Sequence, residues 1–147
     1  MQRLSHGRLA QLLPPGSELW LDGGHNPDGG RAIADALADL EERVPRPLVM
    51  VVGMLATKDS TAFLKNFTGL ARRIIAVAIP HQDKSLTADA IAENARVIGI
   101  SAQSAAGIEE ALGAVAALGL GSPPRVLIAG SLYLAGEVLA LNGTPPA

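Results

Sequence analysis

The chain lacks cysteine and is poor in aromatic residues, which make up 3% of its 147 residues. Without cysteine it has no disulfide, no thiol nucleophile and no thiolate metal ligand, so any chemistry must use oxygen, imidazole, amine or backbone groups. The scarcity of aromatic rings removes the stacking surface on which single-stranded nucleic acid binds. These absences exclude a disulfide scaffold and argue against a nucleic-acid partner.

Neither charge sign is in marked excess, and long hydrophobic runs are missing. Twelve Lys and Arg residues against 14 Asp and Glu residues give a net charge of −2, so no basic field attracts nucleic acid. No apolar run approaches the ~20 residues that span a bilayer. The first seven residues also lack the apolar core of a signal peptide. We therefore expect a cytoplasmic protein with no membrane contact.

Several motifs of independent enzymes are also absent. The chain has neither the Gly-x-x-x-x-Gly-Lys-Ser/Thr phosphate loop nor the Gly-x-Gly-x-x-Gly dinucleotide pattern. It has no Gly-x-Ser-x-Gly elbow and no His-x-x-x-His spacing for zinc. The sequence thus predicts no metal site and no tight binding of ATP through a phosphate loop of its own.

What the chain does contain is a regular alternation of apolar runs and amphipathic stripes. It is 48% hydrophobic and 18% charged, and its length suits one domain with one core. Apolar runs that are typical of strands lie at 18–22, 48–52, 74–79 and 125–129, with a shorter one at 97–103. Helical stripes lie at 33–44, 63–67, 91–95, 108–115 and 132–141.

This order of elements predicts an α/β fold. We expect a three-layer Rossmann-like domain that occupies residues 1–147, with right-handed crossovers and a mostly parallel sheet of about six strands. Ser60 or Thr61 is expected to cap the second helix and Thr87 the third. In such sheets ligands bind beyond the carboxyl ends of the strands, so the loops that follow those ends are the places to search.

The loop after the first apolar run places Asp22 and His25 three residues apart among glycines. Asp22 could accept hydrogen bonds from a ribose diol or hold a cation, while His25 and the amides at the helix start could meet an anion. The alternative is structural: Asp22 accepts hydrogen bonds from loop amides and His25 caps the helix.

Two further loops carry polar residues at the starts of predicted helices. Lys58 could place its ammonium near a carboxylate or phosphate, or it could form an exposed ion pair with Asp59 of little energetic value. Ser131 could bind a ligand or simply cap the last helix. Both interpretations remain open from the residues alone.

Three stretches resemble, in order and spacing, the C-terminal domain of bifunctional folylpolyglutamate synthase/dihydrofolate synthase, a family of the Mur ligase superfamily. They read Leu-Asp-Gly-Gly-His-Asn-Pro at 21–27, Val-Val-Gly-Met-Leu-Ala-Thr-Lys-Asp at 51–59 and Ala-Gly-Ser-Leu-Tyr-Leu-Ala-Gly-Glu-Val at 129–138. The resemblance covers nearly all of the chain.

The resemblance implies an ATP-dependent ligase that joins L-glutamate to dihydropteroate or a folate, with Mg²⁺ and an acyl phosphate. In that family an N-terminal ATPase domain supplies the phosphate loop and the metal ligands, and nothing in this chain resembles that domain. The resemblance thus implies a glutamate ligase domain whose partner is the N-terminal ATPase domain. Alone it would hold neither ATP nor Mg²⁺ and would be inactive.

The resemblance also implies roles for four residues. Asp22 matches the aspartate that contacts the ribose of ATP, and His25 matches a histidine placed near the phosphates and the incoming glutamate, which implies a catalytic role. Lys58 and Ser131 match residues on the glutamate side.

Two positions depart from the family pattern or leave it open. Thr57 stands where the family has the first acid of an Asp-Lys-Asp pattern. The family's ATP-contacting arginine would lie just before residue 1, with Arg8 as an alternative match. A different class of function, a non-catalytic ligand-binding or regulatory module, would suit the same fold.

Overall fold

The computed structural model describes residues 1–144 and contains one six-stranded sheet. The strands are β1 (Gln2–Arg3), β2 (Glu18–Leu21), β3 (Leu48–Val52), β4 (Ala71–Ala76), β5 (Ala102–Ser104) and β6 (Arg125–Ala129). Their order across the sheet is β1-β2-β6-β3-β4-β5, and every neighbouring pair is parallel except the antiparallel β1 and β2. The last strand, β6, therefore lies between β2 and β3.

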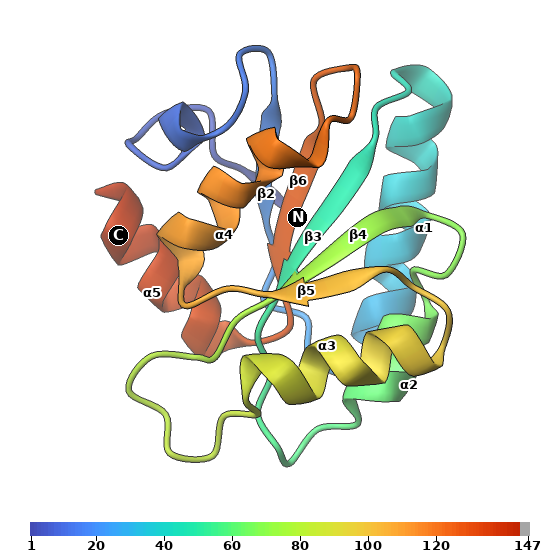
Figure 1. Cartoon of the computed structure of the whole chain (residues 1–147), viewed down its shortest axis with the longest axis vertical. Helices are drawn as coiled ribbons and strands as arrows, with labels where there is room; N and C mark the ends of the chain where they lie inside the picture. Colours follow the sequence, from blue (N-terminus) through green and yellow to red (C-terminus); the bar gives the residue numbers. More distant parts are fainter. Residues whose placement is uncertain (145–147) are drawn as a thin grey trace.

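Helices cover both faces of the sheet, as Figure 1 shows. α1 (Pro27–Arg43), α2 (Ser60–Lys65) and α3 (Ala88–Val97) pack on one face, and α4 (Ile108–Val115) and α5 (Leu132–Asn142) pack on the other. Two 3₁₀ turns lie at Ala10–Leu12 and Ala116–Leu118. The predicted three-layer α/β fold is thus confirmed. Within residues 1–144, no helix is long and apolar enough to cross a membrane.

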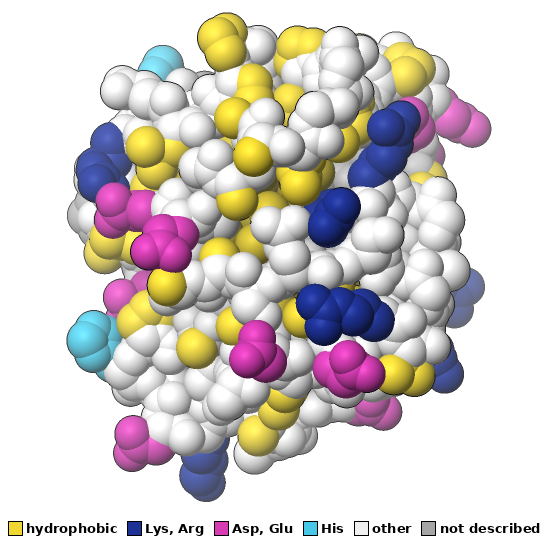
Figure 2. All heavy atoms as spheres, in the orientation of Figure 1, with side chains coloured by type: hydrophobic (Ala, Val, Ile, Leu, Met, Phe, Trp, Pro, Cys, Tyr) yellow, Lys and Arg dark blue, Asp and Glu magenta, His cyan; other side chains and the backbone are white. Residues whose placement is uncertain are grey.

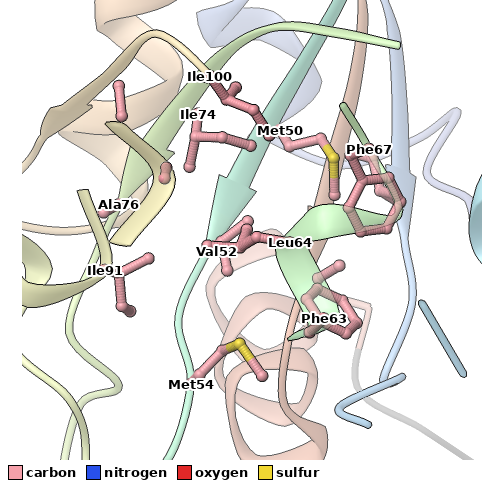
Figure 3. Packing of buried hydrophobic residues seen from close by; sticks show 14 of the residues in the cluster. Met50, Val52, Met54, Phe63, Leu64, Phe67, Ile74, Ala76, Ile91 and Ile100 are labelled. Carbon is pink, nitrogen blue, oxygen red and sulfur yellow. The ribbon is translucent and has the colours of Figure 1, made fainter. Parts of the chain in front are cut away.

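The strands divide their side chains between two hydrophobic cores. Met50 and Val52 of β3 face the core under α1, α2 and α3, where the rings of Phe63 and Phe67 meet at 5.4 Å between centroids (Figure 3). Val51, between them, faces the core under α4 and α5. Because successive side chains of a strand point to opposite faces, an uninterrupted apolar run can supply both cores at once.

The strand boundaries agree with the sequence in the centre of the sheet and differ at its edges. The runs at 48–52 and 125–129 are β3 and β6, and β2 ends one residue before Asp22. The strand expected at 74–79 is wrong by three residues, because β4 begins at Ala71 and includes the two arginines at 72 and 73. The strand expected at 97–103 is reduced to β5, since α3 runs through Val97.

Four helices begin at a side-chain cap, of which Ser131 of α5 is described with the candidate site below. Asn26 caps α1, Asp59 caps α2 and Thr87 caps α3, each by accepting a hydrogen bond from a backbone N–H in the first turn. The prediction for Thr87 is confirmed. The prediction that Ser60 or Thr61 caps α2 is wrong, because the carboxylate of Asp59 accepts from Ala62 N at 3.0 Å.

A charged cluster ties the amino ends of the strands together. Glu18 Oε1 accepts from Arg125 Nε and from Trp20 Nε1, each at 3.0 Å, and Arg46 Nε lies 3.0 Å from Glu18 Oε2. Arg125 is 2% exposed. Burial raises the pKa of Glu18, but the hydrogen bonds from Trp20 and Arg125 and the charges of Arg125 and Arg46 lower it by more, so the pKa lies below 4.5.

The substitution Glu18→Gln tests this cluster. Removing the carboxylate leaves a buried guanidinium without its counter-charge, which costs about 3 kcal/mol at neutral pH. Because the folded pKa of Glu18 is lowered, its charged form stabilises the fold above pH 4.5 and this contribution is lost as the pH falls through the folded pKa. Denaturant unfolding of the wild type and the variant should therefore differ at pH 7 and converge in acid.

The matched control is Glu93→Gln. The Glu93 side chain is 65% exposed and lies 3.7 Å from Arg96, so its replacement should change the free energy of unfolding little at any pH. A loss of stability that is the same for Glu18→Gln at every pH would contradict the role given to the charge.

Candidate functional site

Three loops from three adjacent parallel strands meet at one edge of the sheet. They follow the carboxyl ends of β2, β6 and β3. Together they form a cavity of about 230 Å³, lined by His25, Leu55, Thr57, Lys58, Gly130, Ser131, Leu132 and Tyr133. The structure thus brings three of the four predicted site residues into one cavity, while Asp22 is not among its lining residues.

Gly130 is the point of closest approach between the loops. Its N–H donates to the carbonyl oxygen of Gly24 at 3.1 Å, and the preceding Ala129 carbonyl accepts from Gly53 N at 3.3 Å. Gly130 has a φ of 114°, and a Cβ atom there would clash with the carbonyl oxygen of Gly53. Only glycine fits both the conformation and the space.

Asp22 organises its own loop. Its Oδ1 accepts a hydrogen bond from Gly24 N at 2.7 Å, and Oδ2 lies 3.0 Å from the backbone nitrogen of residue 1. The side chain is 22% exposed. The structural alternative for Asp22, acceptance from a loop amide, is therefore observed, and each oxygen keeps a lone pair for a further donor.

His25 lines the cavity and does not cap a helix. The cap of α1 is Asn26, whose Oδ1 accepts from Gly29 N at 2.7 Å, so the interpretation of His25 as a cap is wrong. Its Nδ1 is buried and has no hydrogen-bond partner within residues 1–144. A buried polar nitrogen without a partner costs free energy.

Ser131 forms the base of the cavity as the cap of α5. Its Oγ accepts from Tyr133 N at 3.0 Å and Leu134 N at 3.4 Å, and the residue is 3% exposed. The capping interpretation is therefore observed. The hydroxyl proton is still available to a ligand, because both of these hydrogen bonds use Ser131 as the acceptor.

Lys58 enters the cavity on a braced loop. It is half-buried, its backbone N–H donates to Leu55 O at 3.1 Å, and its ammonium forms no ion pair within the described residues. The expected pair with Asp59 is wrong, because that carboxylate caps α2. A second loop holds the first in place through Ala56 N to Lys84 O, at 2.7 Å, and Leu86 N to Met54 O, at 2.8 Å.

Sequence reasoning missed two apolar side chains at the cavity mouth. Leu132 is 68% exposed and Tyr133 is 55% exposed, although both stand in an otherwise apolar helix that reads as buried. Because residues of α5 are apolar at nearly every position, the sequence pattern does not show which side of this helix faces solvent. Such exposed apolar residues beside a cavity are typical of surfaces that meet a ligand or another domain.

Arg8 lies outside this cavity. Its Nη2 lies 2.9 Å from Glu109 Oε2, and its Nη1 donates to Leu141 O at 3.4 Å, on the side of the sheet that α4 and α5 cover. Within residues 1–144, no group of three or more His, Asp or Glu side chains is placed to hold a metal ion. The polar groups that line the cavity are thus an imidazole, an ammonium, the hydroxyls of Thr57, Ser131 and Tyr133, and backbone groups.

The fold is that of a Rossmann-like α/β domain, and the sequence identifies its family. The profile of the family described as Mur ligase, glutamate ligase domain, matches residues 7–132. The chain therefore belongs to that family. No functionally curated protein matches it significantly.

Several solved structures share the fold. The chain matches folylpolyglutamate synthase of Mycobacterium tuberculosis complexed with ADP at 23% identity and a TM-score of 0.77, covering 98% of this chain and 34% of that one. It matches ligand-free bifunctional folylpolyglutamate synthase/dihydrofolate synthase of Yersinia pestis at 26% identity and a TM-score of 0.68, covering 91% of this chain and 31% of that one. It matches folylpolyglutamate synthase of Thermotoga maritima at 24% identity and a TM-score of 0.71, covering 96% of this chain and 31% of that one. The chain spans about a third of their length.

The substitution Gly130→Ala tests the packing of the three loops. The methyl group would occupy a strained conformation and meet the Gly53 carbonyl, so we expect a loss of about 3 kcal/mol or more in the free energy of unfolding. Chemical denaturation followed by circular dichroism measures this loss.

Gly113→Ala serves as the matched control. Gly113 lies in α4 with open space around its Cα, so alanine should raise stability by about 0.5 to 1 kcal/mol. Equal effects of the two substitutions would show that the loops do not depend on their contact at Gly130.

Proposed function

We propose that this chain is the C-terminal domain of an ATP-dependent amide ligase that adds L-glutamate to dihydropteroate or a folate. Its partner is an N-terminal ATPase domain, and the complete enzyme works in the cytoplasm with ATP and Mg²⁺. The observation that carries the proposal is the cavity where His25, Lys58 and Ser131 converge from separate loops, in a chain of the glutamate ligase domain family.

The chemistry of the cavity suits an amino acid with a carboxylate. Lys58 offers a positive charge without a partner in the described chain, and the amino end of α5 beside Ser131 adds the positive end of a helix dipole. Both favour the binding of an anion. The place of His25 in the cavity lining supports a position beside the reacting groups, where its imidazole orients the attacking amine or exchanges a proton with it.

Asp22 suits the ribose of ATP. It directly follows the strand β2, and its carboxylate can accept from a hydroxyl while it holds Gly24. ATP, when bound, supplies the phosphoryl group that activates the folate carboxylate. The described residues offer no cluster for Mg²⁺, so in this proposal the ATPase domain holds the metal and most of the phosphate contacts.

The surface beside the cavity suits contact with that second domain. Leu132 and Tyr133 expose apolar area at the mouth of the cavity, and the solved proteins with this fold are about three times as long as the chain. Closure of a second domain over these two side chains would exclude water from the reacting groups. Such closure contributes by positioning the reactants.

A regulatory or ligand-binding module on the same fold is the second candidate. It is favoured by the match to only a third of each solved protein. The coding sequence upstream distinguishes the two: a preceding frame with a Gly-rich phosphate loop supports the ligase.

The first experiment compares the chain alone with the chain joined to its ATPase domain. The chain alone should not add glutamate to folates, because its sequence has no phosphate loop and residues 1–144 contain no group of side chains placed to hold a metal ion. The joined protein should do so with ATP and Mg²⁺, measured as glutamylated product. Robust activity of the chain alone would overturn the division of roles proposed here.

The second experiment assigns roles within the joined protein. Asp22→Ala should mainly raise the Michaelis constant for ATP, because a hydrogen bond to a charged group contributes about 1.5 to 3 kcal/mol in ground and transition states alike. His25→Ala should instead lower kcat, and by more than Lys58→Ala does. Kinetics with ATP and glutamate varied separately measure both effects.

Exposed residues of the same types provide the controls. Asp35→Ala on α1 and His6→Ala near the amino end should leave both constants unchanged, since neither residue lines the cavity. Near-normal kcat in His25→Ala would remove that residue from the reaction centre.

A further inference from the structure

A second cavity lies at the opposite end of the sheet from the candidate site. It has a volume of about 370 Å³ and opens between the end of α1, the first residues of β3 and β4, and the segment before β6. Its charged lining residues are Arg46, Arg72, Arg125 and Glu41. In Figure 2, Lys and Arg side chains gather at the upper right, where the amino ends of β3 and β4 lie in Figure 1.

Arg125 is a buried donor with spare capacity. Its Nε is satisfied by Glu18 at 3.0 Å, and its Nη2 donates to the carbonyl oxygen of Val44 at 3.1 Å. Its Nη1 has only Glu41 Oε2, at 3.7 Å, beyond hydrogen-bond distance. The guanidinium is therefore fixed in place at 2% exposure while one of its nitrogens lacks a close partner.

The two other arginines add to this capacity. Arg46 is held by its Nη1, which donates to Gly16 O at 2.6 Å, and its Nε is buried without a hydrogen bond of good geometry, although Glu18 Oε2 is 3.0 Å away. Arg72 is exposed and forms no ion pair or hydrogen bond within residues 1–144. Three guanidinium groups thus line one cavity. The nitrogens without a hydrogen bond within residues 1–144 are Arg125 Nη1, Arg46 Nη2 and those of Arg72, whereas Arg46 Nε is buried against Glu18.

The charge of the cluster also favours an anion. Arg46 and Arg125 are balanced by Glu18 and Glu41, and Arg72 remains in excess. Glu41 is 49% exposed, and its Oε2 accepts from Arg46 N at 3.0 Å but lies 3.7 Å from Arg125 Nη1, so an incoming oxyanion competes with it only for Arg125. Guanidinium groups match the oxygens of a phosphate in pairs, and the volume suits a small molecule.

We propose that this cavity binds the phosphate group of a small ligand. Arg125 and Arg46 are the fixed donors, and the exposed side chain of Arg72 turns toward the bound phosphate as a third donor. The proposal is independent of the ligase function, because the cavity shares no residue with the one at the carboxyl edge. It concerns either free phosphate or a phosphate ester, which offer the same terminal oxygens.

Nuclear magnetic resonance titration of the whole chain tests the proposal. Inorganic phosphate and glycerol 3-phosphate are added separately at constant ionic strength, with chloride as the balancing ion. At least one should give saturable shifts in the backbone signals of Leu48, Gly69 and Arg72, and the tighter of the two identifies the source of the phosphate. No saturable shift at tens of millimolar of either would overturn the proposal.

Three substitutions separate this site from general anion effects. Arg72→Gln should raise the dissociation constant roughly tenfold or more, because a charged donor is lost, and its exposed side chain makes its loss tolerable to the fold. Glu41→Gln should lower the constant, because it removes the carboxylate that competes for Arg125. Arg31→Gln, on the exposed part of α1, should leave it unchanged. Equal constants in Arg72→Gln and Arg31→Gln would contradict the proposal.

Discussion

The close approach of three loops at Gly130 is the contact on which the candidate site depends. The insertion of β6 between β2 and β3 brings the carboxyl ends of these strands together, and the hydrogen bond from Gly130 N to Gly24 O joins two of the loops that follow. Because a side chain at Gly130 would meet the Gly53 carbonyl, the third loop can lie against them only if that position is glycine. His25 and Lys58 reach one cavity for this reason.

The two ends of the sheet use their polar groups differently. At the amino ends, Glu18 and Arg125 are buried together and fix the strands to one another, while Nη1 of Arg125 has no hydrogen bond within residues 1–144. At the carboxyl ends, Asp59 and Asn26 cap helices, while Nδ1 of His25 and the ammonium of Lys58 have no partner among residues 1–144. The capping residues Asp59 and Asn26 thus fix the loops in place, and His25 and Lys58 line the cavity.

The centre of the fold was predictable because β3 and β6 are buried on both faces and their apolar runs have no competing interpretation. The edges were not: β4 begins with two arginines at the sheet margin, and the two-residue β1 exists only because it pairs with β2. Within the site, the expectation that these loops lie at one edge followed from the common direction of parallel strands. Which residues line the cavity, and which neighbouring polar residue caps a helix, depends on side-chain geometry that no local pattern records.

The central claim is that the carboxyl edge of this sheet holds the nucleotide ribose and the incoming glutamate of a ligase. A crystal structure of the chain joined to its ATPase domain, with a non-hydrolysable ATP analogue and L-glutamate, tests it most directly. The account predicts the ribose beside Asp22 and the glutamate carboxylate beside Lys58, with the amine near His25. Ligands bound wholly within the ATPase domain, with these three side chains facing water, would contradict it.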